Sequence, residues 1–183
     1  LMQHPAPGAP KVAERVVELL IAAGLPAKTS TSRGFDHGVF IPFLPIFPDA
    51  DIPVVPLSLK RNLDPQEHLA AGRALQALRG EGILIVGSGM SYHNMHAFST
   101  PSATAPSEAF DHWLTETVSD NDAKHRWDNL VHWADAPAAR NAHPREEHLL
   151  PLMVAAGAAG DAEGERMFSD IAMQARLSGF RFG

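Results

Sequence analysis

The segment that most constrains the fold is GILIVGSGM, residues 82–90. Its four successive large apolar residues, Ile83 to Val86, leave no polar face, so a strand formed here would be buried on both sides. Strands of this kind lie in parallel sheets covered by helices, and helical patterns flank this run. We therefore expect an α/β fold with a central, mostly parallel sheet flanked by helices. A length of 183 residues fits a single domain, residues 1–183.

Helix-end signals and apolar spacing define the other elements. Asp64 followed by Pro65 is a typical helix start, and Gly24 and Gly80 are natural stops. Prolines limit residues 39–50 to at most one or two helical turns, and place residues 51–59 at the edge or start of a sheet. The expected helices cover residues 11–23, 65–79, 107–118, 122–133 and 145–156, and the expected strands lie at 25–32, 51–59, 83–86 and within 167–183.

Composition excludes several classes of function. The chain has no cysteine, which rules out disulfides, thiolate metal sites and a cysteine nucleophile, and fits a cytoplasmic protein. A net charge of -6 gives no electrostatic case for binding nucleic acid or an anionic membrane. No apolar run approaches the roughly 20 residues of a membrane helix, and the N-terminus lacks the pattern of a signal peptide. The sequence does not indicate an oligomeric state.

Histidine is abundant, with 10 residues, and His37 is the first candidate for a site. It lies in GFDHG, residues 34–38, where glycines flank an acid–histidine pair. Imidazole is the commonest metal ligand in proteins, and Asp36 could orient the ring from outside the ligand shell. The alternative is a loop histidine bonded to the backbone.

His93 is the second candidate, because GSGMSYHNM, residues 87–95, follows the expected buried strand. Ligands of open α/β sheets bind beyond the carboxyl ends of strands. Small residues there would let a substrate or a metal approach the backbone. The alternative is a glycine-rich turn with a surface histidine, and His96 is ambiguous because it lies close by.

His148 is the third candidate, at the start of the apolar helix expected in HPREEHLLPLMVAAGAA, residues 143–159. A histidine at a helix end can point into a cleft, and Glu147 could be an alternative carboxylate. His143 is five residues away, so the two do not share a helix face. The alternative is a capping or core histidine. Four further histidines lie in amphipathic helices and are expected to be structural or solvated: His68, His112, His125 and His132.

Four stretches together resemble the class III extradiol ring-cleavage dioxygenases of the LigB superfamily, and most closely their DOPA-dioxygenase-like branch. The matching stretches are PAPGAPKVAERVVELLIAAGL, GFDHGVFIPFLPIFPDADIPVVPLSL, ILIVGSGMSYHNM and REEHLLPLMVAAGAA, in that order. The resemblance implies a non-haem metal, Fe(II) or alternatively Zn(II), at which O₂ opens a catechol ring. It implies that His37 and His148 are metal ligands. It also implies that His93 is the acid/base residue, which can be counted as a ligand when no substrate is bound.

One feature of the family has no counterpart in this sequence. The family has a further metal-binding histidine near its N-terminus, in a His-Gly-x-Pro type stretch, and His4 does not fit that pattern. The chain is therefore expected to be either a fragment or a natural short form. The missing ligand supports one rival function, a non-catalytic metal-binding or interaction protein on the same fold. A second rival is a zinc hydrolase that uses the same histidines, with Glu147 as base. No His-Glu-x-x-His motif supports the hydrolase.

Overall fold

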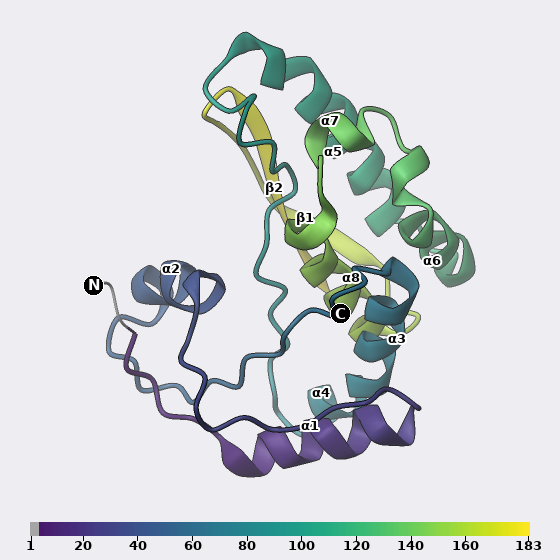
Figure 1. The fold of residues 1–183 in the computed structure, drawn as a ribbon. Helices are drawn as coiled ribbons and strands as arrows, with labels where there is room; N and C mark the ends of the chain where they lie inside the picture. Colours follow the sequence, from purple (N-terminus) through teal and green to yellow (C-terminus); the bar gives the residue numbers. More distant parts are fainter. Residues whose placement is uncertain (1–3) are drawn as a thin grey trace. The chain divides into compact units, whose positions relative to one another are not determined.

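The computed structural model describes residues 4–183, and the chain divides into two compact units, Leu1–Ser58 and Leu59–Gly183 (Figure 1). Helices dominate both units. No helix among the described residues is long and apolar enough to cross a membrane. The assignment of residues 1–183 to one domain stays a prediction.

The first unit contains two helices, α1 (Pro10–Ala22) and α2 (His37–Ile46), joined by extended chain. The start and end of α1 agree with the sequence prediction to within one residue. Proline at its first position suits a helix start, because the amide that proline lacks would be unpaired there in any case. The segment after α2 returns to the N-terminal part of this unit, where Val54 donates its N–H to the Pro7 carbonyl at 2.9 Å.

Helix α2 is longer than its prolines predict. It runs for 10 residues with Pro42 and Pro45 inside, so the limit of one or two turns was wrong. Proline fixes φ near the helical value and removes one intrahelical hydrogen bond, which a short helix tolerates. Asp36 caps the helix by accepting the Gly38 N–H at 3.1 Å.

The second unit contains six helices among the described residues, with three short 3₁₀ turns between them. Helices are found in each region where the sequence predicts one, although the last begins later than expected because residues 146–148 form a 3₁₀ turn first. The helices are α3 (Pro65–Leu75), α4 (Ala77–Gly80), α5 (Thr104–Val118), α6 (Ala123–Val131), α7 (Ala139–Ala142) and α8 (Leu150–Ala159), and the turns are η1 (Pro101–Ala103), η2 (Trp133–Asp135) and η3 (Glu146–His148).

The strand expected within residues 167–183 is confirmed as one arm of an antiparallel hairpin. Strands β1 (Gly164–Ala172) and β2 (Ala175–Phe182) pair along their length (Figure 1). Met173 and Gln174 join them with φ of 50° and 60°, as a two-residue hairpin turn requires. Strand β2 packs on α5, with Ala175 fully buried.

The central, mostly parallel sheet is not confirmed, because β1 and β2 form the only sheet among the described residues. The fold is therefore a mixed helix and sheet structure. Residues 25–32, 51–59 and 83–86 pair with no strand of residues 4–183. Leu84 is 78% exposed and Val86 52%, contrary to the burial on both faces that we expected. An apolar run predicts where a strand could be buried, but not whether neighbours cover it.

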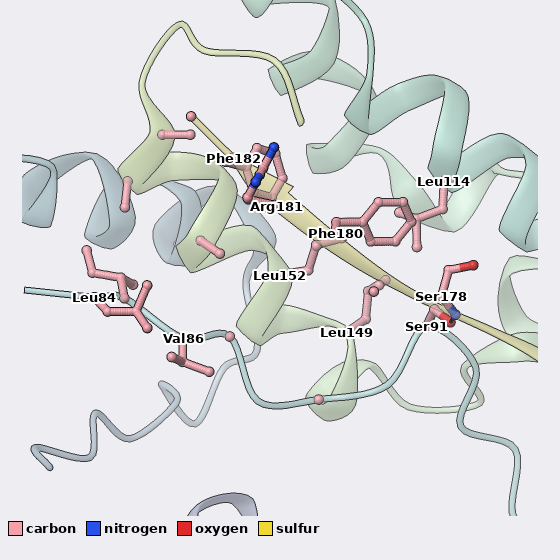
Figure 2. A pocket seen from close by; sticks show the side chains of 18 of the residues that line it. Leu84, Val86, Ser91, Leu114, Leu149, Leu152, Ser178, Phe180, Arg181 and Phe182 are labelled. Carbon is pink, nitrogen blue, oxygen red and sulfur yellow. Dashed lines mark hydrogen bonds between the residues drawn. The ribbon is translucent and has the colours of Figure 1, made fainter. Parts of the chain in front are cut away.

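An open hollow of about 610 Å³ lies beside this extended run, within the second unit. Figure 2 shows Leu84 and Val86 on the extended run, Leu149 and Leu152 around the start of α8, and Phe180 on β2. The hollow also reaches His148. The run that the sequence predicts to be buried on both faces thus borders this open hollow.

Two glycines bring α3 and α8 into close contact. A Cβ added at Gly72 would lie 2.1 Å from the Val154 carbonyl oxygen, and one at Gly157 would lie 2.1 Å from the Leu69 carbonyl oxygen. Both atoms are main chain and cannot move aside cheaply. The buried side chains of Leu69, Leu150 and Met153 complete the contact. This crossing fixes α8, which begins two residues after His148, at Leu150.

We expect Gly157→Ala to lower the free energy of unfolding by about 3 kcal/mol, because the added methyl group forces the two helices apart. Gly80→Ala is the matched control, since nothing lies within 4 Å of its Cβ position. Urea denaturation of both variants measures the difference. Equal stability of the two variants would contradict a close crossing.

Candidate active site

His93 and His148 lie face to face in the second unit. Their ring centroids are 3.5 Å apart and their planes differ by 14°. His93 comes from the loop that follows residues 83–86, and His148 ends the η3 turn, two residues before α8 starts. Both are partly exposed. The structure thus joins two of the three histidines that the sequence selects.

Main-chain hydrogen bonds hold the two histidine segments side by side. Met90 donates its N–H to the His148 carbonyl at 2.9 Å, and His93 donates its N–H to the Ala142 carbonyl at 2.9 Å. The Asn94 side-chain amide donates to the Asn141 carbonyl at 2.8 Å. Residues 90–94 and 141–148 therefore lie along each other, although about 50 residues separate them in sequence.

Ser91 anchors the same loop to two further elements. Its hydroxyl oxygen accepts the Ser178 N–H of β2 at 2.9 Å, and both residues line the hollow in Figure 2. Its carbonyl oxygen accepts a hydrogen bond from His143 Nε2 at 3.0 Å. The residue two positions before His93 is thus held through both its side chain and its main chain.

The glycines of the Gly-Ser-Gly stretch have a different use from the one expected. A Cβ at Gly89 would lie 2.2 Å from the His148 carbonyl oxygen, and one at Gly87 would lie 2.5 Å from the Pro151 carbonyl oxygen. These small residues admit the protein's own main chain. The sequence interpretation, close approach of a ligand to the backbone, missed this contact because it depends on a segment about 60 residues away.

His37 lies in the other unit, as the first residue of α2, and is exposed. The sequence predicts Asp36 as a group that could orient its ring. In the structure the Asp36 carboxylate caps α2 and lies 3.6 Å from the Arg33 guanidinium. The assignment of His37 as a metal ligand stays a prediction. The role of Asp36 in orienting the His37 ring also stays a prediction.

Comparison with known proteins identifies the family of this chain. The protein family described as the catalytic LigB subunit of aromatic ring-opening dioxygenase matches residues 1–176. The chain belongs to the LigB family. Its relatives place it in the DOPA-dioxygenase-like branch.

Two curated relatives of this LigB chain are each named 4,5-DOPA dioxygenase extradiol. That of Portulaca grandiflora is 44% identical over 167 residues, and that of Beta vulgaris is 40% identical over 164 residues. The alignments cover 87% of this chain but only 59% of each relative. The chain therefore spans less than two thirds of the length of these relatives.

A solved structure has the same fold. The crystal structure of an uncharacterized protein from Escherichia coli K12 matches with a TM-score of 0.84 at 32% identity. The match covers 97% of this chain and 73% of that protein. The paired histidine segments therefore belong to a fold that is shared beyond this chain.

LigB extradiol dioxygenases are non-haem metal enzymes, usually with Fe(II). The donor type of the histidine pair fits such a metal, because imidazole nitrogen binds both Fe(II) and Zn(II). Among residues 4–183, no group of three or more histidine, cysteine, aspartate or glutamate side chains is gathered so that it could hold a metal ion. The Glu147 carboxylate, considered as an alternative ligand or base, lies 2.9 Å from Arg145 Nε.

His143 is a core histidine, fully buried among aromatic rings. Its ring centroid lies 5.2 Å from that of Phe110 and 6.0 Å from that of Trp133, both in edge contacts. Burial lowers the pKa of His143 to about 4, although the hydrogen bond to the Ser91 carbonyl opposes this shift. The imidazole is therefore neutral at neutral pH.

The remaining helical histidines are structural or paired near the surface, as expected. His68 is buried, with Nδ1 at 2.6 Å from the Asp64 carbonyl and Nε2 accepting the Lys60 N–H at 3.1 Å. The other three pair with acidic residues or with the main chain of their own region: His112 with Glu116, His125 with Asp120, and His132 with the Asp128 carbonyl.

We expect Gly89→Ala to break the contact between the two histidine segments, because the methyl group would overlap the His148 carbonyl that Met90 bonds. The Met90 amide should then exchange its hydrogen at least about tenfold faster, as expected when a hydrogen bond worth about 1.5 kcal/mol is lost. Amide exchange by NMR measures this, with Gly80→Ala as control. Unchanged protection of Met90 would show that the segments tolerate a side chain there.

Burial of His143 makes stability depend on pH. Free imidazole ionises near pH 6.5, so between about pH 6.5 and 4 the unfolded chain binds a proton that the folded chain does not. The free energy of unfolding should therefore fall as pH drops through this range, by up to about 1.4 kcal/mol per pH unit from this group. Urea denaturation of wild type and His143→Gln at several pH values isolates the effect. Identical pH slopes would contradict a buried neutral ring.

Proposed function

We propose that this chain acts as an extradiol ring-cleavage dioxygenase that opens a catechol-type, DOPA-like aromatic with O₂ at a non-haem metal. The observation that carries the proposal is the face-to-face pairing of His93 and His148 at 3.5 Å. Membership of the LigB family and the names of the relatives support the reaction class. The proposed site of action is the cytoplasm.

His148 and His37 are the proposed metal ligands in this scheme. Fe(II) is the proposed metal and Zn(II) the alternative, since imidazole suits both. When bound, a redox-active metal would supply open coordination positions for the substrates and electron transfer between the catechol and O₂. The main-chain bond from Met90 to the His148 carbonyl keeps His148 fixed for this role.

His93 is the proposed proton-transfer residue. A neutral imidazole can take a proton from a catechol hydroxyl at one ring nitrogen and return it as the ring opens, because its ordinary pKa lies near neutral pH. Its stacking on His148 places it beside a proposed ligand. The main-chain N–H of His93 donates to the Ala142 carbonyl, which limits the movement of the His93 backbone. The ring would therefore transfer the proton from one defined position.

A non-catalytic metal-binding protein on the same fold is the second candidate. It is favoured by the absence of a group of three or more suitable donors within residues 4–183. Such a protein would bind metal without consuming oxygen. The third idea, a zinc hydrolase with Glu147 as base, loses support because Arg145 lies against that carboxylate.

The test is oxygen uptake by the Fe(II)-reconstituted chain with a panel of catechols that includes DOPA. We expect uptake with a yellow ring-opened product, and a fall in kcat of about 10² or more in His93→Ala at unchanged metal content, since general acid–base catalysis contributes about 10²–10⁴.

The matched control is His96→Ala, three residues away in the same loop and exposed, which should keep wild-type activity. Ring cleavage that survives His93→Ala at unchanged metal content would contradict the assignment of His93. Bound metal without oxygen uptake from any catechol would favour the non-catalytic candidate.

A further inference from the structure

Residues 142–148 form hydrogen bonds with three positions of the loop that carries His93, namely Met90, Ser91 and His93. Ala142 accepts the His93 N–H, and His148 accepts the Met90 N–H through its carbonyl. Between these bonds, the His143 ring contacts the Ser91 carbonyl at 3.0 Å. His143 supplies the side-chain bond in this series, and it lies entirely within the core.

The chemistry of this contact defines the tautomer of His143. A carbonyl oxygen only accepts hydrogen bonds, so His143 Nε2 must carry the proton. In a neutral ring Nδ1 is then a bare acceptor. His143 Nδ1 is buried and has no hydrogen-bond partner in the part of the chain that the structure describes.

An unsatisfied buried acceptor is unfavourable, and an apolar side chain of similar size would avoid it. The edge contacts with Phe110 and Trp133 use the His143 ring as an apolar surface and require neither ring nitrogen. Packing alone therefore does not explain histidine at position 143. The distinctive contribution of this ring is its Nε2–H donor to Ser91.

We infer that His143 is a positioning residue for His93. Its Nε2–H holds the Ser91 carbonyl, fixes the main chain two residues before His93, and so keeps the His93 ring on His148. This inference rests on the proposed function for its kinetic consequence. Its structural content, the position of the His93 loop, can be measured without any activity.

Two substitutions separate positioning from packing. His143→Gln keeps an amide donor close to the position of Nε2, whereas His143→Leu fills the space without a donor. We expect His143→Leu to lower kcat about 10–100-fold, as the loss of supporting hydrogen bonds does at metal sites, with KM changed less than about threefold. We expect His143→Gln to stay within about threefold of wild type in both constants.

A role in packing alone predicts a different result. Both variants would then lose folded protein, while kcat per folded, metal-loaded chain would stay at the wild-type value. Equal loss of kcat in the Gln and Leu variants would also overturn the inference, because only one of them lacks the donor. His143→Met is a second donor-free variant for the case in which the Leu variant does not fold.

Two NMR measurements test the inference without turnover. Long-range ¹H–¹⁵N correlations should show the Nε2–H tautomer of His143 in the wild type, and an Nδ1–H tautomer would overturn the inference. The His93 amide should exchange at least about tenfold faster in His143→Leu but not in His143→Gln. If the wild type consumes no oxygen with any catechol, the proposed function fails, while these measurements still decide the role of His143.

Discussion

The candidate site depends on the hydrogen bonds that join residues 90–94 to residues 141–148. Neither segment is a regular helix or strand over its full length, so neither could hold a histidine in place alone. Together they satisfy each other's main-chain groups, which buried or half-buried chain requires. The stacking of His93 on His148 follows from this pairing.

The helices and the hairpin make the pairing rigid. Helix α8 begins two residues after His148, and the glycines of α3 and α8 let these helices cross in main-chain contact. Strand β2 holds the other segment through the Ser178 N–H bond to the Ser91 hydroxyl. The side chains of a site are positioned most precisely when helices and strands support them. Here the start of α8 and strand β2 give that support.

Local signals predicted the local structure well. The Asp64-Pro65 start of α3 is correct, because capping involves only neighbouring residues, and the Asp64 carboxylate accepts the Glu67 N–H at 3.0 Å. Asp36 gives the same kind of signal, and α2 begins directly after it, although the prolines that follow predict only one or two helical turns there. A parallel sheet could not be inferred reliably from Ile83–Val86 alone, because the apolarity of a segment does not specify which strands lie beside it.

The site was predictable in part. His93 and His148 were selected from their positions after an apolar run and at a helix start, and from the resemblance to one family. The function of Gly89 and the bond from His143 to Ser91 were not predictable, because both depend on contacts between segments more than 50 residues apart. Such contacts leave no periodic pattern in the sequence.

A crystal structure of the Fe(II)-loaded chain with a bound catechol would test the central claim most directly. The account predicts the metal about 2.0–2.2 Å from a ring nitrogen of His148, the distance usual for imidazole ligands. It also predicts a ring nitrogen of His93 within about 3.2 Å of a catechol oxygen, which is hydrogen-bonding reach for proton transfer. A metal bound away from His148, or a catechol that does not contact His93, would contradict it.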